Sequence, residues 1–227
     1  MNERLQPELD LILASASPRR RELLERVGLR LSVLPAEIDE SPHAAERAGD
    51  YVRRMAIEKA AAAVRLLERA ASPASPVAAD ATAAARGRPA IPLLAADTTV
   101  IVDGSILGKP IDEADARQML GRLAGRRHEV TTAYRIVFGG REVDRSVTTT
   151  VAIRLLDPRE VNAYLSGGEW RGKAGGYAVQ GIAAAFVTEL RGSWTNVVGL
   201  PLAEVLADLR ALDAVPNYPP ERFTPDA

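Results

Sequence analysis

The sequence contains no cysteine and only two histidines, His43 and His128, among its 227 residues. The absence of cysteine excludes disulfides, thiolate nucleophiles and cysteine-ligated zinc, and it is compatible with a reducing compartment. Two histidines are too few for a polyhistidine metal site. A catalytic metal would therefore be bound mainly by oxygen ligands, which favours magnesium or manganese over zinc.

The chain also lacks an excess of charge of one sign and lacks long apolar runs. Its 29 basic and 30 acidic residues give a net charge of −1, whereas a dedicated duplex-DNA binder usually carries a strongly basic face. No apolar run approaches the length of a membrane span, and the N-terminus has no signal-peptide pattern. We therefore expect a cytoplasmic protein with no nucleic-acid or membrane partner, although a local basic pocket stays compatible with this balance.

The remaining composition is typical of a folded protein, with 47% apolar and 26% charged residues and enough length for one large domain or two small lobes. Hydrophobic periodicity predicts strands at 9–14, 31–34, 93–96, 99–102, 105–108, 129–138, 143–155 and 184–190. Cap and breaker residues predict helices at 18–27, 50–69, 158–167 and 201–212, and one that begins at Asp112 or Asp115 and ends at Gly125. This mixture of helices with parallel and antiparallel strands predicts an α/β fold.

Two segments differ in composition from the rest. Residues 71–92 are rich in alanine, proline and serine, which predicts a flexible surface insertion rather than a domain boundary. Residues 215–227 contain four prolines, which predicts a disordered tail.

The most informative stretch is Ser15-Ala16-Ser17-Pro18-Arg19-Arg20-Arg21, directly after the first apolar run. Ser17 followed by Pro18 predicts a helix start with a hydroxyl N-cap and proline at the first helical position, and Gly28 suits the helix end. A helix N-terminus offers free backbone N–H groups to an anion, and guanidinium groups match phosphate oxygens. The alternative is a capped surface helix with a solvated basic turn.

Asp97 is the clearest candidate carboxylate. It follows the apolar residues 93–96 and precedes Thr98, so we expect it at the end of a buried strand, where ligand sites of open α/β sheets lie. A carboxylate there can hold a metal or orient water; the alternative is a turn aspartate that caps the next element. Glu40 or Asp39 offers a second carboxylate, although an acidic surface loop is the simpler interpretation.

Candidate cations follow in three separate segments. Lys59 lies in the middle of a predicted helix, where a solvated lysine is the more common explanation. Lys109 follows the predicted Asp103-Gly104 hairpin turn in Gly108-Lys109-Pro110, which displays an ammonium group from a rigid turn. Lys173 and Gln180 lie in the glycine-rich segment 172–181, which allows a ligand to approach the backbone or forms a loop without a ligand.

Two further features are expected to be structural. His128 lies beside Arg126 and Arg127 and is expected to pack or to form hydrogen bonds rather than act as an acid or base. Residues 196–201 are expected to form an architectural turn before the last helix.

Taken together, these motifs resemble the Maf family of nucleoside triphosphate pyrophosphatases. The opening signature of that family is matched by Leu13-Ala14-Ser15-Ala16-Ser17-Pro18-Arg19-Arg20-Arg21-Glu22-Leu23-Leu24. Further matches are Ile38-Asp39-Glu40-Ser41, Glu58-Lys59-Ala60, Ala96-Asp97-Thr98, Leu107-Gly108-Lys109-Pro110, Lys173-Ala174-Gly175-Gly176-Tyr177-Ala178-Val179-Gln180-Gly181 and Asn196-Val197-Val198-Gly199-Leu200-Pro201. The matches occur in order along most of the chain, from about residue 9 to about residue 210.

The resemblance implies an elongated mixed β-sheet with flanking helices that form two lobes around a cleft, as in the inosine-triphosphatase relatives. It implies a single domain over residues 1–227. The implied reaction is hydrolysis of a nucleoside triphosphate between the α and β phosphates, which gives the monophosphate and pyrophosphate. The implied cofactor is a divalent cation, magnesium or manganese, and a homodimer is expected by family analogy.

The resemblance also implies roles residue by residue. Asp97 would be the proton acceptor, with Glu40 and Asp97 near the metal. The residues expected to hold the triphosphate are Ser15, Arg20, Lys59 and Lys109. The residues expected to tune base choice are Arg19, Thr98 and Gln180, and Lys173 joins the substrate-binding set.

Two local patterns favour the family branch that acts on dTTP and UTP. These are Pro18-Arg19-Arg20 and Tyr177-Ala178-Val179-Gln180-Gly181, whereas the branch acting on 7-methyl-GTP tends to have tryptophan after the proline and a Ser-Glu-Gly ending. dTTP, UTP and modified pyrimidine nucleotides are therefore the expected substrates. The chain departs from the family pattern at Gly172, where aspartate is usual, at Thr99, where valine is more usual, and in the length of segment 71–92.

A second hypothesis is a nucleotide-binding regulator of cell division without significant turnover. Such a protein would use the same arginines, but it would not need Asp97 and Glu40 to hold a metal. Release of pyrophosphate distinguishes the two hypotheses.

Overall fold

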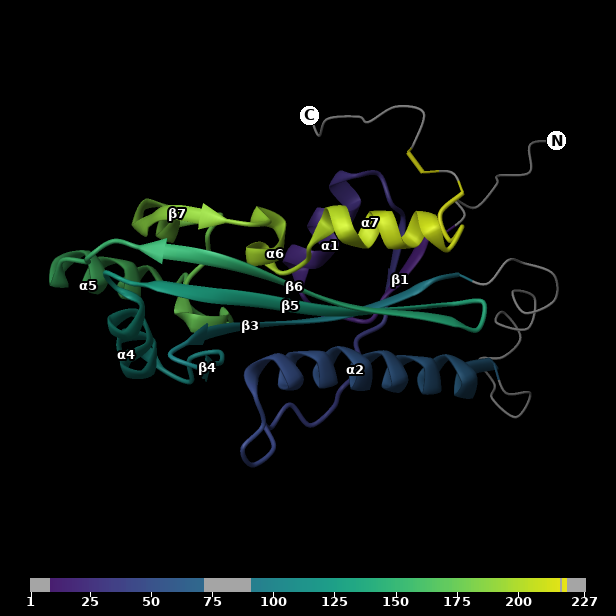
Figure 1. Cartoon of the computed structure of the whole chain (residues 1–227), viewed down its shortest axis with the longest axis horizontal. Helices are drawn as coiled ribbons and strands as arrows, with labels where there is room; N and C mark the ends of the chain where they lie inside the picture. The colour runs from purple at the N-terminus through teal and green to yellow at the C-terminus, as the bar shows by residue number, and fades with distance from the viewer. Residues whose placement is uncertain (1–8, 72–90, 217, 220–227) are drawn as a thin grey trace.

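The computed structural model describes residues 9–71, 91–216 and 218–219. Its centre is a seven-stranded mixed sheet in the order β2-β1-β3-β5-β6-β7, with β4 paired to β3. Helices cover both faces of the sheet (Figure 1), which confirms the predicted α/β class and the mixed sheet with flanking helices. The division into two lobes stays a prediction. The segment at 72–90 lies outside the described residues.

The strands are β1 (Leu11–Leu13), β2 (Leu31–Val33), β3 (Leu93–Val102), β4 (Ser105–Leu107), β5 (Arg127–Phe138), β6 (Arg141–Ile153) and β7 (Val187–Arg191). The α-helices are α1 (Pro18–Arg26), α2 (Ala48–Ala71), α4 (Glu113–Leu123), α5 (Pro158–Gly167), α6 (Trp194–Val198) and α7 (Leu202–Ala211). Two 3₁₀ turns, η1 (Ala174–Gly176) and η2 (Ile182–Phe186), lie between α5 and β7. None of these described helices combines the length and apolar composition needed to cross a membrane.

Strand β3 corrects the prediction for Asp97. Instead of two short strands with Asp97 at an end, residues Leu93–Val102 form one continuous strand with Asp97 in its middle. The reason is the antiparallel ladder with β5, which pairs every residue from Leu93 to Ile101. On its other edge, β3 pairs with β1 only at Leu93 and Leu94. Asp97 therefore lies just beyond the carboxyl end of the short parallel strand β1, which is the kind of place where such sheets bind ligands.

Helix α2 lies along one face of the sheet (Figure 1). Its buried side includes Ala56, Ala60 and Ala63, which are all 0% exposed, and these small side chains allow the helix backbone to lie close to the strands. The helix begins at Ala48, two residues before the predicted N-cap, so Asp50 lies in its first turn rather than at the cap. This close packing brings the side chain of Lys59 to Asp97 of β3, just beyond the carboxyl end of β1.

Helices α1, α6 and α7 lie on the opposite face (Figure 1). One large hydrophobic cluster includes Tyr134 and Ile136 of β5 and Leu209 of α7, each at most 1% exposed, and it extends to Leu120 of α4. Val215, the first residue of the predicted tail, is 5% exposed and belongs to the same cluster. Residue 217 and residues 220–227 lie outside the described residues.

Local signals were reliable at several element ends. Asp112 caps α4 by accepting a hydrogen bond from the backbone N–H of Asp115 at 2.8 Å, and Asp157 caps α5 in a capping box. The Asp103-Gly104 turn has φ angles of +51° and +71°, as a tight hairpin turn requires. Ser17 occupies the N-cap position before Pro18, as predicted, but the expected capping hydrogen bond of its hydroxyl is not formed in the described structure.

The segment before the last strand also differs from prediction. Residues expected to form a strand from 184 instead form the 3₁₀ turn η2, and β7 begins only at Val187. The backbone N–H groups of Ile182 and Ala183 donate to the Glu169 side chain rather than to a strand partner. This interaction starts the turn and delays the strand.

Candidate active site

A cavity of about 680 Å³ lies where β1 ends and continues between β3, the N-terminus of α1 and the glycine-rich segment 172–181. This volume is typical of a small-molecule site. Five cations and three carboxylates line the cavity, which gives it a local charge of +2 in a chain of net charge −1. The charged lining residues are Arg19, Arg20, Lys59, Lys109, Lys173, Glu37, Glu40 and Asp97.

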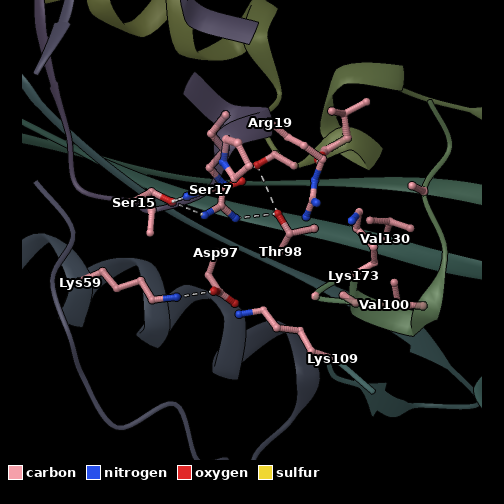
Figure 2. Close-up of a pocket in the computed structure, with 18 of the residues that line it drawn as sticks. Ser15, Ser17, Arg19, Lys59, Asp97, Thr98, Val100, Lys109, Val130 and Lys173 are labelled. Atoms are coloured by element: carbon pink, nitrogen blue, oxygen red, sulfur yellow. Dashed lines mark hydrogen bonds and ion pairs between the residues drawn. The ribbon is translucent and has the colours of Figure 1, made fainter. Parts of the chain in front are cut away.

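The centre of the site is an ammonium group held between two carboxylates. Lys59 Nζ lies 2.7 Å from Asp97 Oδ1 and 2.7 Å from Glu40 Oε1. Lys59 and Asp97 are mostly buried, with side chains 11% and 14% exposed, so the solvated lysine favoured from the sequence is wrong. Lys109 Nζ is 3.9 Å from the other oxygen of Glu40, and its side chain is 64% exposed. Figure 2 shows Lys59 and Lys109 converging on Asp97 from two sides.

Glu40 is positioned by residues of α2 that the sequence did not single out. The Tyr51 hydroxyl donates to the backbone carbonyl of Glu40 at 2.9 Å, and Arg54 donates to the carbonyl of Ser41 at 3.0 Å. Burial raises the pKa of Glu40, but the hydrogen bond and charge of Lys59 outweigh this effect and hold the pKa below its ordinary value. Asp39 does not line the cavity; it accepts a hydrogen bond from the backbone N–H of Ser41 at 2.9 Å.

The two carboxylates suit a divalent cation. Both already converge on one positive charge, and hard oxygen donors are the ligands that magnesium and manganese prefer. Within residues 9–71, 91–216 and 218–219, no group of three or more histidine or carboxylate side chains forms a metal cluster. The protein therefore offers a partial set of ligands, and magnesium commonly completes such a set with substrate phosphates and water.

Arg20 also lines the cavity and is committed to internal hydrogen bonds. Its Nε donates to the Gly199 carbonyl at 2.7 Å, Nη1 donates to Ser15 Oγ at 3.0 Å, and Nη2 donates to Thr98 Oγ1 at 3.0 Å. Three of its five N–H groups are thus used, and the residue is only 8% exposed. Burial lowers the pKa of Arg20, and the negative charge of Asp97 opposes this shift. Arg20 therefore joins α1 to the turn after β1, to β3 and to the residue that follows α6.

Ser15 and Thr98 belong to that same network. Ser15 Oγ also accepts a hydrogen bond from the backbone N–H of Ser17 at 3.2 Å. Thr98 Oγ1 is 2.8 Å from Thr132 Oγ1. Both residues line the cavity, but their hydroxyl groups already make hydrogen bonds within the protein. Their contribution is therefore to hold the cavity wall in place.

Arg19, Lys173 and Gln180 also line the cavity, and Figure 2 shows Arg19 and Lys173 on the side away from Lys59. Arg19 Nε donates to the Val198 carbonyl at 3.2 Å, which leaves its two terminal nitrogens directed into the cavity, as Figure 2 shows. Burial lowers the pKa of Arg19, and burial followed by the nearby charge of Arg19 lowers the pKa of Lys173. Gln180 is exposed on the same wall. The structure therefore brings all ten predicted site residues to one cavity, listed here from the N-terminus: Ser15, Arg19, Arg20, Glu40, Lys59, Asp97, Thr98, Lys109, Lys173 and Gln180.

The segment before the last helix is architectural, as expected, but the sequence did not indicate that it positions the two arginines. The short helix α6 and the turn that follows it present the Val198 and Gly199 carbonyls to Arg19 and Arg20. Asn196 is 0% exposed and donates to the Val130 carbonyl at 2.9 Å, which fixes this segment against β5. No periodic pattern signals such a role, because it depends on contacts between residues far apart in the chain.

A simple count carried a signal that was overlooked. The chain has 29 basic residues, but only Lys59, Lys109 and Lys173 are lysines, and all three line the cavity. The protein uses arginine for its other cations. An ammonium group is a compact charge with three donors, whereas the guanidinium group is a planar fork.

His128 is structural, as expected. It is 3% exposed, its Nε2 lies 2.7 Å from the Tyr177 hydroxyl, and the two rings meet edge to face with centroids 5.4 Å apart. Burial lowers the pKa of His128 to about 4, so the ring is neutral near pH 7. Tyr177 lines the cavity, so His128 supports the cavity wall without facing the ligand space.

Comparison with known proteins identifies the family of the chain. A family model described as Maf-like protein matches residues 10–212. The dTTP/UTP pyrophosphatase of Cereibacter sphaeroides is 46% identical over 211 residues, which cover 92% of this chain and 98% of that protein. Proteins with the same name from Bordetella parapertussis and Nitrosomonas europaea are 48% and 44% identical, over 88% and 86% of this chain and 91% and 90% of their own lengths. The chain belongs to the Maf-like protein family.

Proposed function

We propose that this chain is a nucleoside triphosphate pyrophosphatase that hydrolyses dTTP and UTP to the nucleoside monophosphate and pyrophosphate. The observation that carries the proposal is one shared cavity in which Asp97 faces two lysines, with Arg19 and Lys173 beyond it. The relatives named dTTP/UTP pyrophosphatase, which match most of the chain, support the choice of pyrimidine nucleotides.

The cations of the site are suited to a triphosphate, which carries about four negative charges near neutral pH. Lys109 is the most exposed of the lysines whose ion pairs are described, so its ammonium group is the first that a phosphate meets. Lys59 uses two of its three N–H donors on carboxylates and retains one for a phosphate oxygen. Arg20 positions the turn before α1, and its remaining N–H groups and those of Arg19 complete the binding of the nucleotide.

Asp97 is the proton acceptor in this proposal. Its Oδ1 accepts a hydrogen bond from Lys59, and its Oδ2 has no hydrogen-bond partner within the described part of the chain. Oδ2 can therefore accept a proton from a water molecule that attacks the α-phosphorus. A bond forms between the water oxygen and the α-phosphorus, the bond to the bridging oxygen breaks, and pyrophosphate leaves with that oxygen.

Glu40 and Asp97 are the residues that would hold a divalent cation. Magnesium or manganese, when bound, would neutralise charge on the phosphate oxygens and polarise the phosphoryl group. The contribution of the protein is then to hold two carboxylates at one place, which Lys59 and Tyr51 do through the contacts described above.

The test is a screen for pyrophosphate release with canonical and modified nucleotides in the presence of magnesium, manganese or cobalt. We expect dTTP and UTP to be the preferred substrates and nucleoside monophosphate to form in equal amount. Because all three lysines line the cavity, protection of lysines from an amine-reactive reagent by UTP measures binding independently of turnover. Protection without pyrophosphate release would favour a nucleotide-binding regulator instead.

A further inference from the structure

The glycine-rich wall at residues 172–181 is attached to the rest of the protein at separate points. In its first half, the backbone N–H of Gly175 donates to the Gly108 carbonyl at 2.9 Å. The Tyr164 hydroxyl donates to the Gly176 carbonyl at 3.1 Å. These bonds fix the part of the wall that follows Lys173.

The second half of the wall ends at a carboxylate. Glu169 Oε2 accepts a hydrogen bond from the backbone N–H of Ile182 at 2.8 Å, and Oε1 accepts one from Ala183 at 3.2 Å. Gln180 lies just before these residues, is exposed, and has no hydrogen-bond partner among the residues that the structure describes. Its place in the cavity is therefore set by the backbone that Glu169 holds.

Gly181 makes this arrangement sterically specific. A Cβ atom at position 181 would lie 2.0 Å from Glu169 Oε2 and 2.8 Å from Oε1. The φ angle of Gly181 is −113°, which other residues adopt, so the close approach of the carboxylate and not the backbone conformation favours glycine. A larger residue would displace the flexible end of the Glu169 side chain.

We infer that Glu169 is a positioning residue for the nucleoside end of the substrate, acting through the wall that carries Gln180 and Lys173. The inference rests on the proposed function, because it takes the lysines beside Asp97 as the pyrophosphate end. Figure 2 shows Lys59 and Lys173 on opposite sides of Asp97 and Thr98, so the two ends of a bound nucleotide meet different walls. The negative charge of Glu169 also acts on Lys173, whose pKa it raises against the lowering by burial and by Arg19.

The first test separates the two ends of the ligand. Glu169→Ala is expected to raise KM for UTP about tenfold and to change kcat less than about twofold, because about one hydrogen-bond equivalent of binding is lost. The inhibition constant of pyrophosphate should stay at the wild-type value, since that ligand contacts the lysine end. Glu169→Gln keeps one acceptor oxygen, so its KM for UTP should lie between the values of the wild type and of Glu169→Ala. A general loss of folding would change all three constants together.

The second test uses the contact with Gly181. Gly181→Ala should reproduce the Glu169→Ala phenotype, and the double variant should be no worse than either single variant. Glu160→Ala is the matched control, because Glu160 bonds Arg154 at 2.7 Å and caps α5 away from the cavity lining. It should leave the ratio of the UTP and pyrophosphate constants unchanged.

The outcomes distinguish this inference from the proposed function. Suppose that the wild-type protein releases pyrophosphate. If neither Glu169→Ala nor Gly181→Ala changes the ratio of the UTP and pyrophosphate constants, or if the effects of the two substitutions multiply, the inference about Glu169 is wrong. The proposal of a pyrophosphatase is then unaffected. If no turnover occurs, the same ratio is measured from the dissociation constants of UTP and pyrophosphate, and the expected shift still supports Glu169. A protein that binds neither ligand overturns both.

Discussion

Replacement of Asp97 by asparagine tests the central chemistry of the site. The substitution keeps the size of the side chain and an acceptor oxygen for Lys59, but it removes the negative charge and the proton acceptor. A positioned general base contributes about 10²- to 10⁴-fold to rate, so we expect kcat to fall about a thousandfold, which corresponds to about 4 kcal/mol of barrier.

The effect on stability should be much smaller. Removal of one partner from a buried ion pair costs about 3–5 kcal/mol when the remaining charge has no other partner. Here Lys59 keeps Glu40 at 2.7 Å, and the side chain of Glu40 is 46% exposed and able to adjust. We therefore expect a loss of about 1 kcal/mol in the free energy of unfolding, or a fall in Tm of about 2–4 °C.

The assay is pyrophosphate release from UTP at saturating magnesium, with thermal unfolding followed by circular dichroism. Asp208→Asn is the matched control, because Asp208 is 8% exposed and accepts hydrogen bonds from Tyr134 at 2.6 Å and Arg145 at 2.7 Å on the α7 side of the sheet. It should lower Tm without lowering kcat. If Asp97→Asn retained more than about a tenth of the wild-type kcat, the role assigned to Asp97 would be refuted.

Three further predictions concern the surroundings of the site. Lys109→Ala should raise KM for UTP about tenfold with little change in kcat, since it removes an exposed phosphate-binding charge; unchanged kinetics would exclude Lys109 from the site. Arg20→Lys should lower the free energy of unfolding by about 2 kcal/mol in denaturant titrations, because an ammonium group cannot make the same three hydrogen bonds to Gly199, Ser15 and Thr98. The control Arg21→Lys, on the exposed face of α1, should be nearly neutral. His128 has a folded-state pKa of about 4, below its unfolded value of about 6.5. Between these two pH values the unfolded chain binds more protons than the folded chain. The free energy of unfolding should therefore fall by about 3 kcal/mol as the pH decreases from about 6.5 to about 4. His128→Gln should remove this part of the pH dependence, and the exposed control His43→Asn should keep it; equal pH profiles for wild type and His128→Gln would contradict the argument.

Sequence and structure agree best where the interactions are local. The caps at Asp112 and Asp157 and the turn at Asp103-Gly104 depend on partners within three residues, so their residue types nearly determine the backbone. Ser17 takes the predicted N-cap position, but its hydroxyl makes no capping hydrogen bond, and Ser15 Oγ accepts from the backbone N–H of Ser17 and from Arg20. The continuous strand through Asp97 was missed because it depends on a distant partner, since Asp97 pairs with Ala133 of β5.

By itself, the sequence determined the class of fold, the order of the motifs and the kinds of side chain available for phosphate chemistry. These depend on periodicity, turn residues and charge, which act over a few neighbouring positions. Only the tertiary structure decided which of those side chains meet: Lys59 reaches Asp97 across 38 positions, and Arg20 reaches Gly199 across 179. Such contacts form because α2 packs against the sheet and α1 packs against α6, which places each buried charged group beside the partners it needs. No local sequence pattern encodes which partners these are.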